Sequence, residues 1–170
     1  MKATDKDSGL TAELVRELLH YDPATGRFAW RLGRFGTRGA GGRAGYTEPR
    51  GYRQIRVAGR LYLEHRLVWL YVNGTWPSNQ IDHVNGIKGD NRIANLREAT
   101  ASENQGNQRK ARSNSTTGFL GVCWDKPNKK FRAQIMFSGK QKYIGMFSTA
   151  EQAHQAYLVA KRELHPFCTL

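Results

Sequence analysis

Apolar residues in the first half of the chain recur at helical spacing in residues 11–20 and 64–73. Each segment has four of them on one predicted face: Leu14, Val15, Leu18 and Leu19, then Leu67, Val68, Tyr71 and Val72. We expect the second set to pack under the short strands that follow. Between the two helices, residues 51–57 and 60–63 flank Ala58-Gly59, a pair typical of a β-hairpin turn.

Three apolar runs in the second half of the chain, residues 119–124, 131–137 and 142–147, predict strands joined by tight turns. Ser148 and Glu151 have the spacing of a capping box, so a helix should follow. Small and apolar residues recur along that helix at helical spacing: Ala153, Ala156, Tyr157, Ala160 and Leu164. The runs predict a small three-stranded antiparallel sheet packed on one helix.

The central segment predicts a strand, a loop, a second strand and a helix. Residues 79–83 suit a short strand, and residues 84–91 (VNGIKGDN) have the Asn, Asp and Gly content of a loop. Residues 95–97 can form the second strand. Thr100 and Glu103 make a capping box, which predicts a helix from Thr100 to about Arg112.

These patterns indicate an α+β protein with two folded parts. We expect a disordered start over residues 1–9, a first domain over 10–112, a linker over 113–117 and a second domain over 118–170. The glycine-rich run of residues 33–45 has no apolar period, which favours a flexible loop.

The charge of the chain favours a polyanionic partner. Lys and Arg number 27 against 14 Asp and Glu, giving a net charge of +13. Residues 27–60 hold nine arginines and one acidic residue, and residues 105–145 hold nine basic residues and one acidic residue. Such patches bind phosphates without reading sequence. The candidate DNA contacts outside the C-terminal strands are Arg34, Arg38, Arg43, Arg53, Arg56, Arg109 and Lys110.

Other partners and compartments are disfavoured. No stretch approaches the roughly 18 apolar residues of a membrane span, and no basic amphipathic helix accompanies the patches. Cys123 and Cys168 lack metal-ligand spacing, so we expect reduced thiols and no structural zinc. Residues 1–9 lack the apolar core of a signal peptide, which favours the cytoplasm, here of a bacterial host cell.

The candidate chemistry lies in the central segment. Asp82-His83 is followed by Asn95, twelve positions after the histidine, and by Asn104, nine positions later. Hydrolysis of a phosphodiester with one divalent metal requires an oxygen ligand for Mg²⁺ or Mn²⁺, an imidazole that takes a proton from water, and a group that holds the imidazole. Taken singly, each residue suits an ordinary turn, whereas their order together favours a nuclease.

The segment IDHVNGIKGDNRIANLREATASEN resembles the ββα-metal module of HNH endonucleases of the phage type, over Leu61 to about Asn107. The resemblance implies that His83 is the general base, that Asp82 and Asn104 bind one Mg²⁺ or Mn²⁺ ion, and that Asn95 braces the loop that orients His83. The family name expects histidine where this chain has Asn104, a replacement found in many phage members.

Three further residues of this region are open to a second interpretation. Asn85 and Asn91 are taken as loop-forming, with Asn91 as a secondary brace. His65 lies in the predicted helix of residues 64–73, and we expect it to be a buried hydrogen-bonding residue rather than a ligand.

The C-terminal segment, with GFLGVCWD, KKFRAQI and KYIGMFSTAEQAHQAYLVAKRELH, resembles the ethylene-response-factor type of DNA-binding domain. That resemblance implies a sheet that lies in the DNA major groove, with Arg132, Gln134, Lys140 and Lys142 as candidate contacts. Leu120, Cys123 and Asp125 stand where the plant pattern has base-reading arginines, so plant-type specificity does not carry over. We expect Trp124 to be a packing residue.

Together these features predict a metal-dependent DNA endonuclease, phage- or mobile-element-encoded, of the nicking or homing kind. One such module addresses one strand, so a monomer should nick double-stranded DNA, and a dimer would be needed for a double-strand break. One alternative is a DNA-binding regulator or packaging accessory with an inactive nuclease fold. Another is a nuclease or binding protein for RNA.

Overall fold

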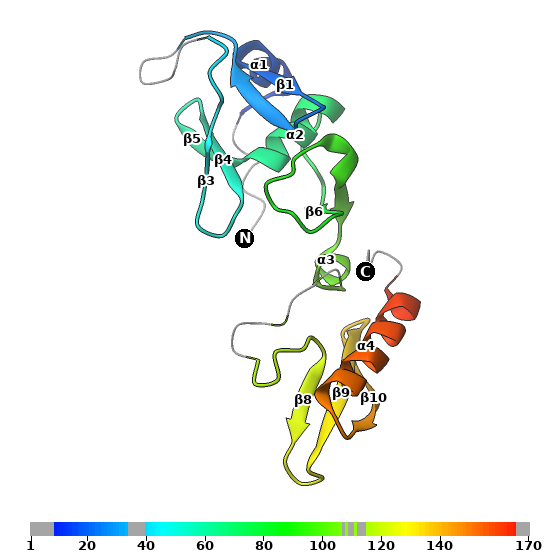
Figure 1. Ribbon diagram of the computed structural model, residues 1–170. Coiled ribbons are helices and arrows are strands. Elements are labelled where there is room, and N and C mark those ends of the chain that lie inside the picture. Colours follow the sequence, from blue (N-terminus) through cyan, green and yellow to red (C-terminus); the bar gives the residue numbers. More distant parts are fainter. Residues whose placement is uncertain (1–8, 34–39, 107, 109–110, 112–114, 166–170) are drawn as a thin grey trace. The chain divides into compact units, whose positions relative to one another are not determined.

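The computed structural model describes residues 9–33, 40–106, 108, 111 and 115–165. The chain divides into two compact units, residues 1–98 and 99–170. Small antiparallel sheets and four α-helices alternate along the described residues, in agreement with the predicted α+β class (Figure 1). The predicted domain boundaries at 112 and 118 stay a prediction.

The first unit opens with α1 (Ala12–Leu18), whose N-cap Thr11 accepts a hydrogen bond from the backbone N–H of Leu14. The helix is shorter than predicted, because the chain extends at Leu19 into β1 (Leu19–Asp22). β1 pairs antiparallel with β2 (Arg27–Trp30). Gly26 ends the turn between them with a φ of 69°, and a Cβ there would collide with the backbone of Arg92.

A three-stranded sheet follows, in the order β3 (Tyr46–Thr47), β4 (Arg53–Val57), β5 (Arg60–Leu63). Ala58 and Gly59 both have positive φ, which confirms the predicted hairpin turn between β4 and β5. α2 (Glu64–Asn73) begins directly after β5 and has the predicted bounds. It ends at Gly74, which adopts the left-handed conformation.

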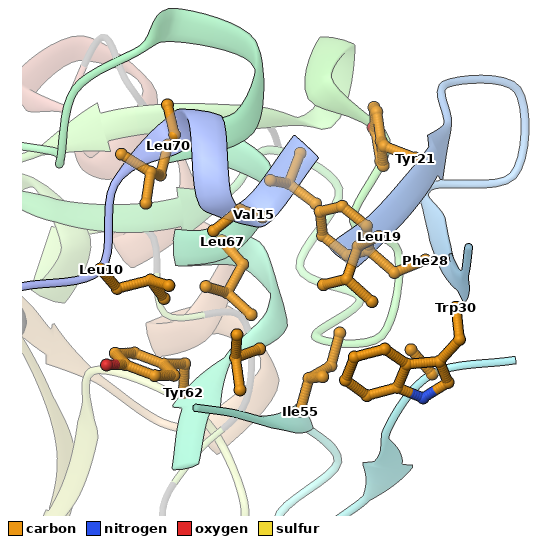
Figure 2. Close-up of a cluster of buried hydrophobic side chains, with 14 of the residues drawn as sticks. Leu10, Val15, Leu19, Tyr21, Phe28, Trp30, Ile55, Tyr62, Leu67 and Leu70 are labelled. Carbon is orange, nitrogen blue, oxygen red and sulfur yellow. The ribbon is translucent and has the colours of Figure 1, made fainter. Parts of the chain in front are cut away.

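The core of the first unit lies between the two helices and the sheets, where Val15, Leu19, Phe28, Ile55 and Leu67 are all buried (Figure 2). Leu67 and Val68 pack in this core as predicted. The prediction was wrong for Val72, which is 42% exposed. The buried face of α2 instead includes Leu70, three positions after Leu67, because that spacing keeps both on the side covered by the core.

The central segment contains β6 (Gln80–His83) and β7 (Leu96–Ala99), which pair with each other. The predicted first strand and the loop of residues 84–91 are confirmed. The second strand starts one residue later than predicted, because Asn95 belongs to the short 3-10 helix η1 (Ile93–Asn95).

The second unit begins with α3 (Ala101–Gly106), and its predicted capping box is confirmed. The N–H of Thr100 donates to Glu103 Oε2 at 2.7 Å, and the N–H of Glu103 donates to Thr100 Oγ1 at 3.3 Å. The helix was predicted to reach about Arg112, but it ends at Gly106, and Gln108 and Ala111 are not helical. Glycine costs about 1 kcal/mol relative to alanine inside a helix, which favours an end at this position.

Three strands then form a sheet in the order β10 (Lys140–Phe147), β9 (Lys130–Phe137), β8 (Val122–Asp125). α4 (Ala150–Leu164) packs on one face of this sheet, where Ala133 and Ala153 are fully buried. The sheet and helix were predicted, but the cap was not. Thr149 rather than Ser148 is the N-cap, and its hydroxyl accepts from the N–H of Gln152 at 3.2 Å.

Candidate functional site

His83 is the last residue of β6, and the residue is 4% exposed. Its Nε2 lies 2.9 Å from the side-chain oxygen of Asn91. The rings of His65 and Tyr52 lie 5.1 and 6.2 Å from the His83 ring, with His65 in an edge-to-face arrangement. Burial lowers the pKa of His83 below its usual value, so the imidazole is neutral at pH 7 and able to accept a proton.

Asp82, the neighbour of His83 in β6, is also buried. Arg97 on β7 donates to Asp82 Oδ2 from Nε at 3.0 Å and from Nη2 at 2.8 Å. The two donors converge on one oxygen, and these charge-assisted hydrogen bonds tie the carboxylate to Arg97 beside the strand that carries His83. Arg97 was not anticipated from the sequence as a partner of Asp82.

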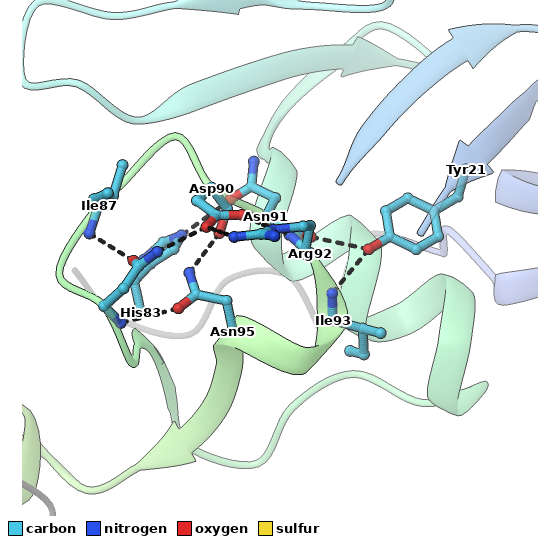
Figure 3. A network of polar contacts seen from close by, with 9 residues as sticks. Tyr21, His83, Ile87, Asp90, Asn91, Arg92, Ile93 and Asn95 are labelled. Carbon is cyan, nitrogen blue, oxygen red and sulfur yellow. Dashed lines mark hydrogen bonds and ion pairs between the residues drawn. The ribbon is translucent and has the colours of Figure 1, made fainter. Parts of the chain in front are cut away.

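Asn95 holds the loop of residues 84–91 from below (Figure 3). Its side-chain oxygen accepts from the N–H of Asn85 at 2.9 Å, and its side-chain nitrogen donates to the carbonyl of Asp90 at 2.8 Å. One amide therefore ties the first part of the loop to the last. This geometry is that of a brace, which is the role predicted for Asn95.

Asp90 closes the same loop through two partners. Its carboxylate accepts from Arg92 at 2.6 and 2.8 Å and from the side chain of Asn85 at 2.7 Å. The hydrogen bonds from Arg92 are the main cause that lowers the pKa of Asp90 to about 2. Asp90 is therefore ionised at all working pH values, and its carboxylate is committed to the loop.

Asn91 connects this loop to the core of the first unit. It is 0% exposed, its side-chain nitrogen donates to Glu64 Oε2 at 3.0 Å, and its carbonyl accepts from the hydroxyl of Tyr21 at 3.0 Å. Glu64 is also 0% exposed, and it accepts from the N–H of Phe28 and forms an ion pair with Arg53. Burial raises the pKa of Glu64, and Arg53 opposes that rise.

A chain of buried polar groups thus runs from Arg53 through Glu64 and Asn91 to His83. Of these, the sequence identified His83 and suggested Asn91 as a secondary brace, but missed Glu64. The sequence did contain a sign that Glu64 is buried. Glu64 precedes Leu67 and Val68 by three and four positions, which places it on the apolar face of the helix. A carboxylate on a buried face needs partners in the interior.

Comparison with known proteins places this site in a family. A family model described as HNH endonuclease matches residues 62–105. "Protein 3.8" of Escherichia phage T7 is 32% identical over 115 residues, which cover 67% of this chain and 91% of the phage protein. The chain carries an HNH endonuclease domain over residues 62–105 and belongs to the same family as this phage protein. No solved structure matches it significantly.

The HNH match includes β6, the loop and β7, together with most of α3. Asp82, His83, Asn95 and Asn104 therefore all lie within the matched residues. Asn104 is a half-buried residue of α3 in the second unit, and its part in metal binding stays a prediction.

His65 of the HNH domain is buried, as predicted. Its Nδ1 does not make the expected hydrogen bond with any of the described residues. Burial, followed by the nearby His83, lowers the pKa of His65 to about 3. His65 is therefore a neutral ring that packs against His83.

The arginines of the first unit that were predicted to contact DNA differ in how far they are exposed to solvent. Arg56 and Arg43 are both exposed, and partial desolvation is the largest cause that lowers the pKa of Arg43. Arg53 is only 5% exposed, and it also donates to the carbonyl of Ala44 at 2.7 Å. It therefore supports Glu64 from inside the unit, and the expected phosphate contact does not hold for it. Four other candidates lie outside the described residues: Arg34, Arg38, Arg109 and Lys110.

The candidate contacts on the C-terminal sheet lie on two different faces. Ala133 faces α4, so the alternation along β9 places Arg132 and Gln134 on the open face. Lys142 is paired with Ile135, and Lys140 with Phe137, which puts both lysines on the face of Ala133. The expectation that all four residues share one DNA-facing surface is corrected, because paired residues of an antiparallel sheet point to the same side.

Two further expectations concern the same sheet. Trp124 packs edge-to-face on Phe131 with ring centroids 4.8 Å apart, yet it stays 43% exposed. Cys123 is a free cysteine, and Cys168 lies outside the described residues. Across the part of the chain that the structure describes, no helix has the length and apolar character needed to cross a membrane.

A metal site built from protein ligands alone requires several ligand side chains close together. Within residues 9–33, 40–106, 108, 111 and 115–165, no three His, Cys, Asp or Glu side chains come together as a ligand set. Asp82 offers one carboxylate. Mg²⁺ commonly binds proteins through one or two carboxylates and takes water and substrate phosphate as its other ligands. The residues present fit a weakly held ion of that kind.

Proposed function

We propose that this chain is a metal-dependent DNA endonuclease of the HNH type that hydrolyses phosphodiester bonds, with His83 as its general base. The observation that carries the proposal is the buried, neutral His83 ring beside Asp82, at the end of β6 where the braced loop begins, inside the family match. A neutral imidazole held in one orientation is the group that proton abstraction from water requires.

In this mechanism His83 takes a proton from a water molecule through the ring nitrogen that does not face Asn91. General-base catalysis of this type contributes roughly 10²- to 10⁴-fold to a rate. Asn95 keeps the loop closed so that the ring is already oriented before DNA binds, which avoids reorganisation during the reaction. The basic residues of the first unit hold the DNA backbone by charge.

Asp82 and Asn104 are the proposed ligands of one Mg²⁺ or Mn²⁺ ion. A bound divalent ion would polarise the scissile phosphate and stabilise the charge on the leaving oxygen. Arg97 orients the Asp82 carboxylate through Oδ2. An ordered carboxylate loses less conformational freedom when it takes up a further partner.

The open face of the C-terminal sheet is the proposed DNA-reading surface, by its resemblance to the ethylene-response-factor domain. Arg132 and Gln134 are its candidate contacts, since they lie on the face opposite α4. Because one module cuts one strand, we expect a monomer that nicks double-stranded DNA in the host cell and is encoded by a phage or mobile element.

A second candidate function is a DNA-binding regulator or packaging accessory with an inactive module. The ion pair of Arg97 with Asp82 favours it, because a carboxylate bound to arginine is neutralised before any metal arrives. Cleavage assays separate the two functions directly.

The test is incubation of supercoiled plasmid with the protein in Mg²⁺, in Mn²⁺ and in EDTA. A nuclease converts the plasmid to the open circle with either metal and not with EDTA. His83→Ala should remove cleavage and leave DNA binding intact, whereas His20→Ala, at an exposed histidine of β1, should cleave normally. Binding without cleavage by the unaltered protein would favour the regulator, and cleavage by His83→Ala at the normal rate would overturn the role of His83.

A further inference from the structure

The buried chain of polar groups beneath His83 has a defined direction of hydrogen bonding. It starts at Glu64, where Arg53 Nε and the backbone N–H of Phe28 both donate to the carboxylate. Arginine and the backbone N–H are donors only, so both Glu64 oxygens act as acceptors. The group that approaches Glu64 Oε2 from Asn91 at 3.0 Å must therefore be the amide NH₂.

The orientation of the Asn91 amide decides which of its two groups, the oxygen or the NH₂, faces His83 Nε2. With its NH₂ turned to Glu64, the amide presents its oxygen to His83 Nε2 at 2.9 Å. An amide oxygen accepts hydrogen bonds and does not donate them. His83 Nε2 must then carry the proton, and Nδ1 carries the lone pair.

The side chain of Asn91 has little freedom to adopt another arrangement. It is 0% exposed, so water cannot replace either partner. The peptide link between Asn91 and Arg92 is held in place, because its carbonyl accepts from the hydroxyl of Tyr21 and Gly26 packs closely against it. Reversal of the amide would bring its oxygen against Glu64 Oε2 and its NH₂ against the Nε2–H of His83, and buried groups without partners are costly.

We propose that Asn91 and Glu64 are positioning residues that hold His83 in the Nε2–H tautomer and so make Nδ1 the nitrogen that takes the proton from water. The inference rests on the proposed function of His83 as a general base. Glu64 acts through Asn91, and Arg53 acts by supplying the counter-charge that keeps Glu64 an acceptor. Asn95 does not belong to this chain, because its amide binds the backbone and not the His83 ring.

The tautomer is measured by long-range proton–nitrogen correlation NMR of the histidine rings, at mildly alkaline pH where imidazole is neutral. The spectrum of His83→Ala assigns the His83 signals among the five histidines. We expect a protonated Nε2 and an unprotonated Nδ1 in the unaltered protein. A protonated Nδ1 would overturn the proposal.

Glu64→Gln tests whether Glu64, acting through Asn91, sets the tautomer of His83; we call this coupling the relay. Glutamine keeps the size of the side chain, but its NH₂ can face Asn91 and allow the Asn91 amide to reverse. We expect the His83 nitrogen signals to shift toward a mixture of tautomers and the nicking rate to fall about 10-fold or more, with unchanged DNA affinity in EDTA. Glu48→Gln, which loses an ion pair with Arg50 at the surface, is the matched control and should change neither quantity.

A purely structural role for Glu64 predicts a lower melting temperature with unchanged His83 nitrogen signals, and that result would overturn the relay. If Glu64→Gln does not fold, the tautomer of the unaltered protein still decides the matter. The spectrum does not require cleavage. Loss of the proposed nuclease function, seen as plasmid that stays supercoiled, is therefore a separate result from loss of the relay.

Discussion

Replacement of Arg53 by methionine tests whether the buried pair with Glu64 stabilises the first unit. Methionine has a similar length but no charge and no N–H donor. The substitution leaves the fully buried carboxylate of Glu64 without its ionic partner. It also removes the donors to the carbonyl of Ala44 and to the hydroxyl of Thr47.

Removal of one partner from a buried pair costs about 3–5 kcal/mol, because the remaining charge stays desolvated. The N–H groups of Phe28 and Asn91 stay with Glu64, so we expect the lower end, about 3 kcal/mol. That is a large part of the free energy of unfolding of a typical domain, about 5–15 kcal/mol. With a urea m-value of about 2 kcal/mol/M, the unfolding midpoint should fall by about 1.5 M.

Urea unfolding followed by tryptophan fluorescence measures this loss in a Trp124→Phe background. Of the four tryptophans, Trp124 belongs to the second unit, so the other three then report on the first unit. Arg56→Met is the matched control, because Arg56 lies on the same strand but is exposed. The control should keep its urea midpoint and lose DNA affinity.

The double variant Arg53→Met/Glu64→Gln should be more stable than Arg53→Met alone, since the buried charge is gone. Two results would refute this reasoning. The first is a midpoint for Arg53→Met equal to that of the Arg56→Met control. The second is a double variant less stable than either single variant.

Three further predictions follow from the site and the C-terminal sheet. The low pKa of His65 means that the unfolded chain binds its proton more readily, so stability is full above about pH 6.5 and falls by about 2 kcal/mol by about pH 5. Urea unfolding of His65→Phe should lose that pH dependence, and an unchanged dependence would contradict the assignment. Asp82→Ala should nick plasmid only at raised Mn²⁺, and activity independent of Mn²⁺ would remove Asp82 from the ligand set. Arg132→Ala should lower DNA affinity and reduce its salt slope by about 1, measured by fluorescence anisotropy, whereas an equal effect of Lys142→Ala would contradict the assignment of faces.

The local elements of this protein were largely predictable from its sequence. The hairpin turn at Ala58-Gly59, the bounds of α2 and the three C-terminal strands all follow from turn chemistry and from the spacing of apolar residues. Such features depend on residues a few positions apart. The errors at Leu19, Val72 and Gly106 lie at the ends of helices, where pairing and packing decide the last turn.

The candidate chemistry was found because Asp82, His83 and Asn95 lie close together in the chain and have residue types suited to hydrolysis. Their order along the chain predicted an HNH nuclease, and the family match over residues 62–105 agrees. The partners of these residues were not found. Arg97, which donates to Asp82, lies fifteen positions further along the chain. Nothing in the sequence around Arg97 distinguishes it from the other arginines on strands.

The sequence by itself determined most of the helices, strands and turns, the charge of the chain and the motif that carries His83. Only the tertiary structure decided which charges are buried and which side of a sheet each residue takes. Arg53 and Arg56 look equivalent in the sequence, yet one supports Glu64 from the interior and the other is exposed. The physical reason is that burial and register depend on residues distant along the chain: Glu64 and Asn91 meet across 27 positions, and a shift of one residue in pairing exchanges the two faces of a strand.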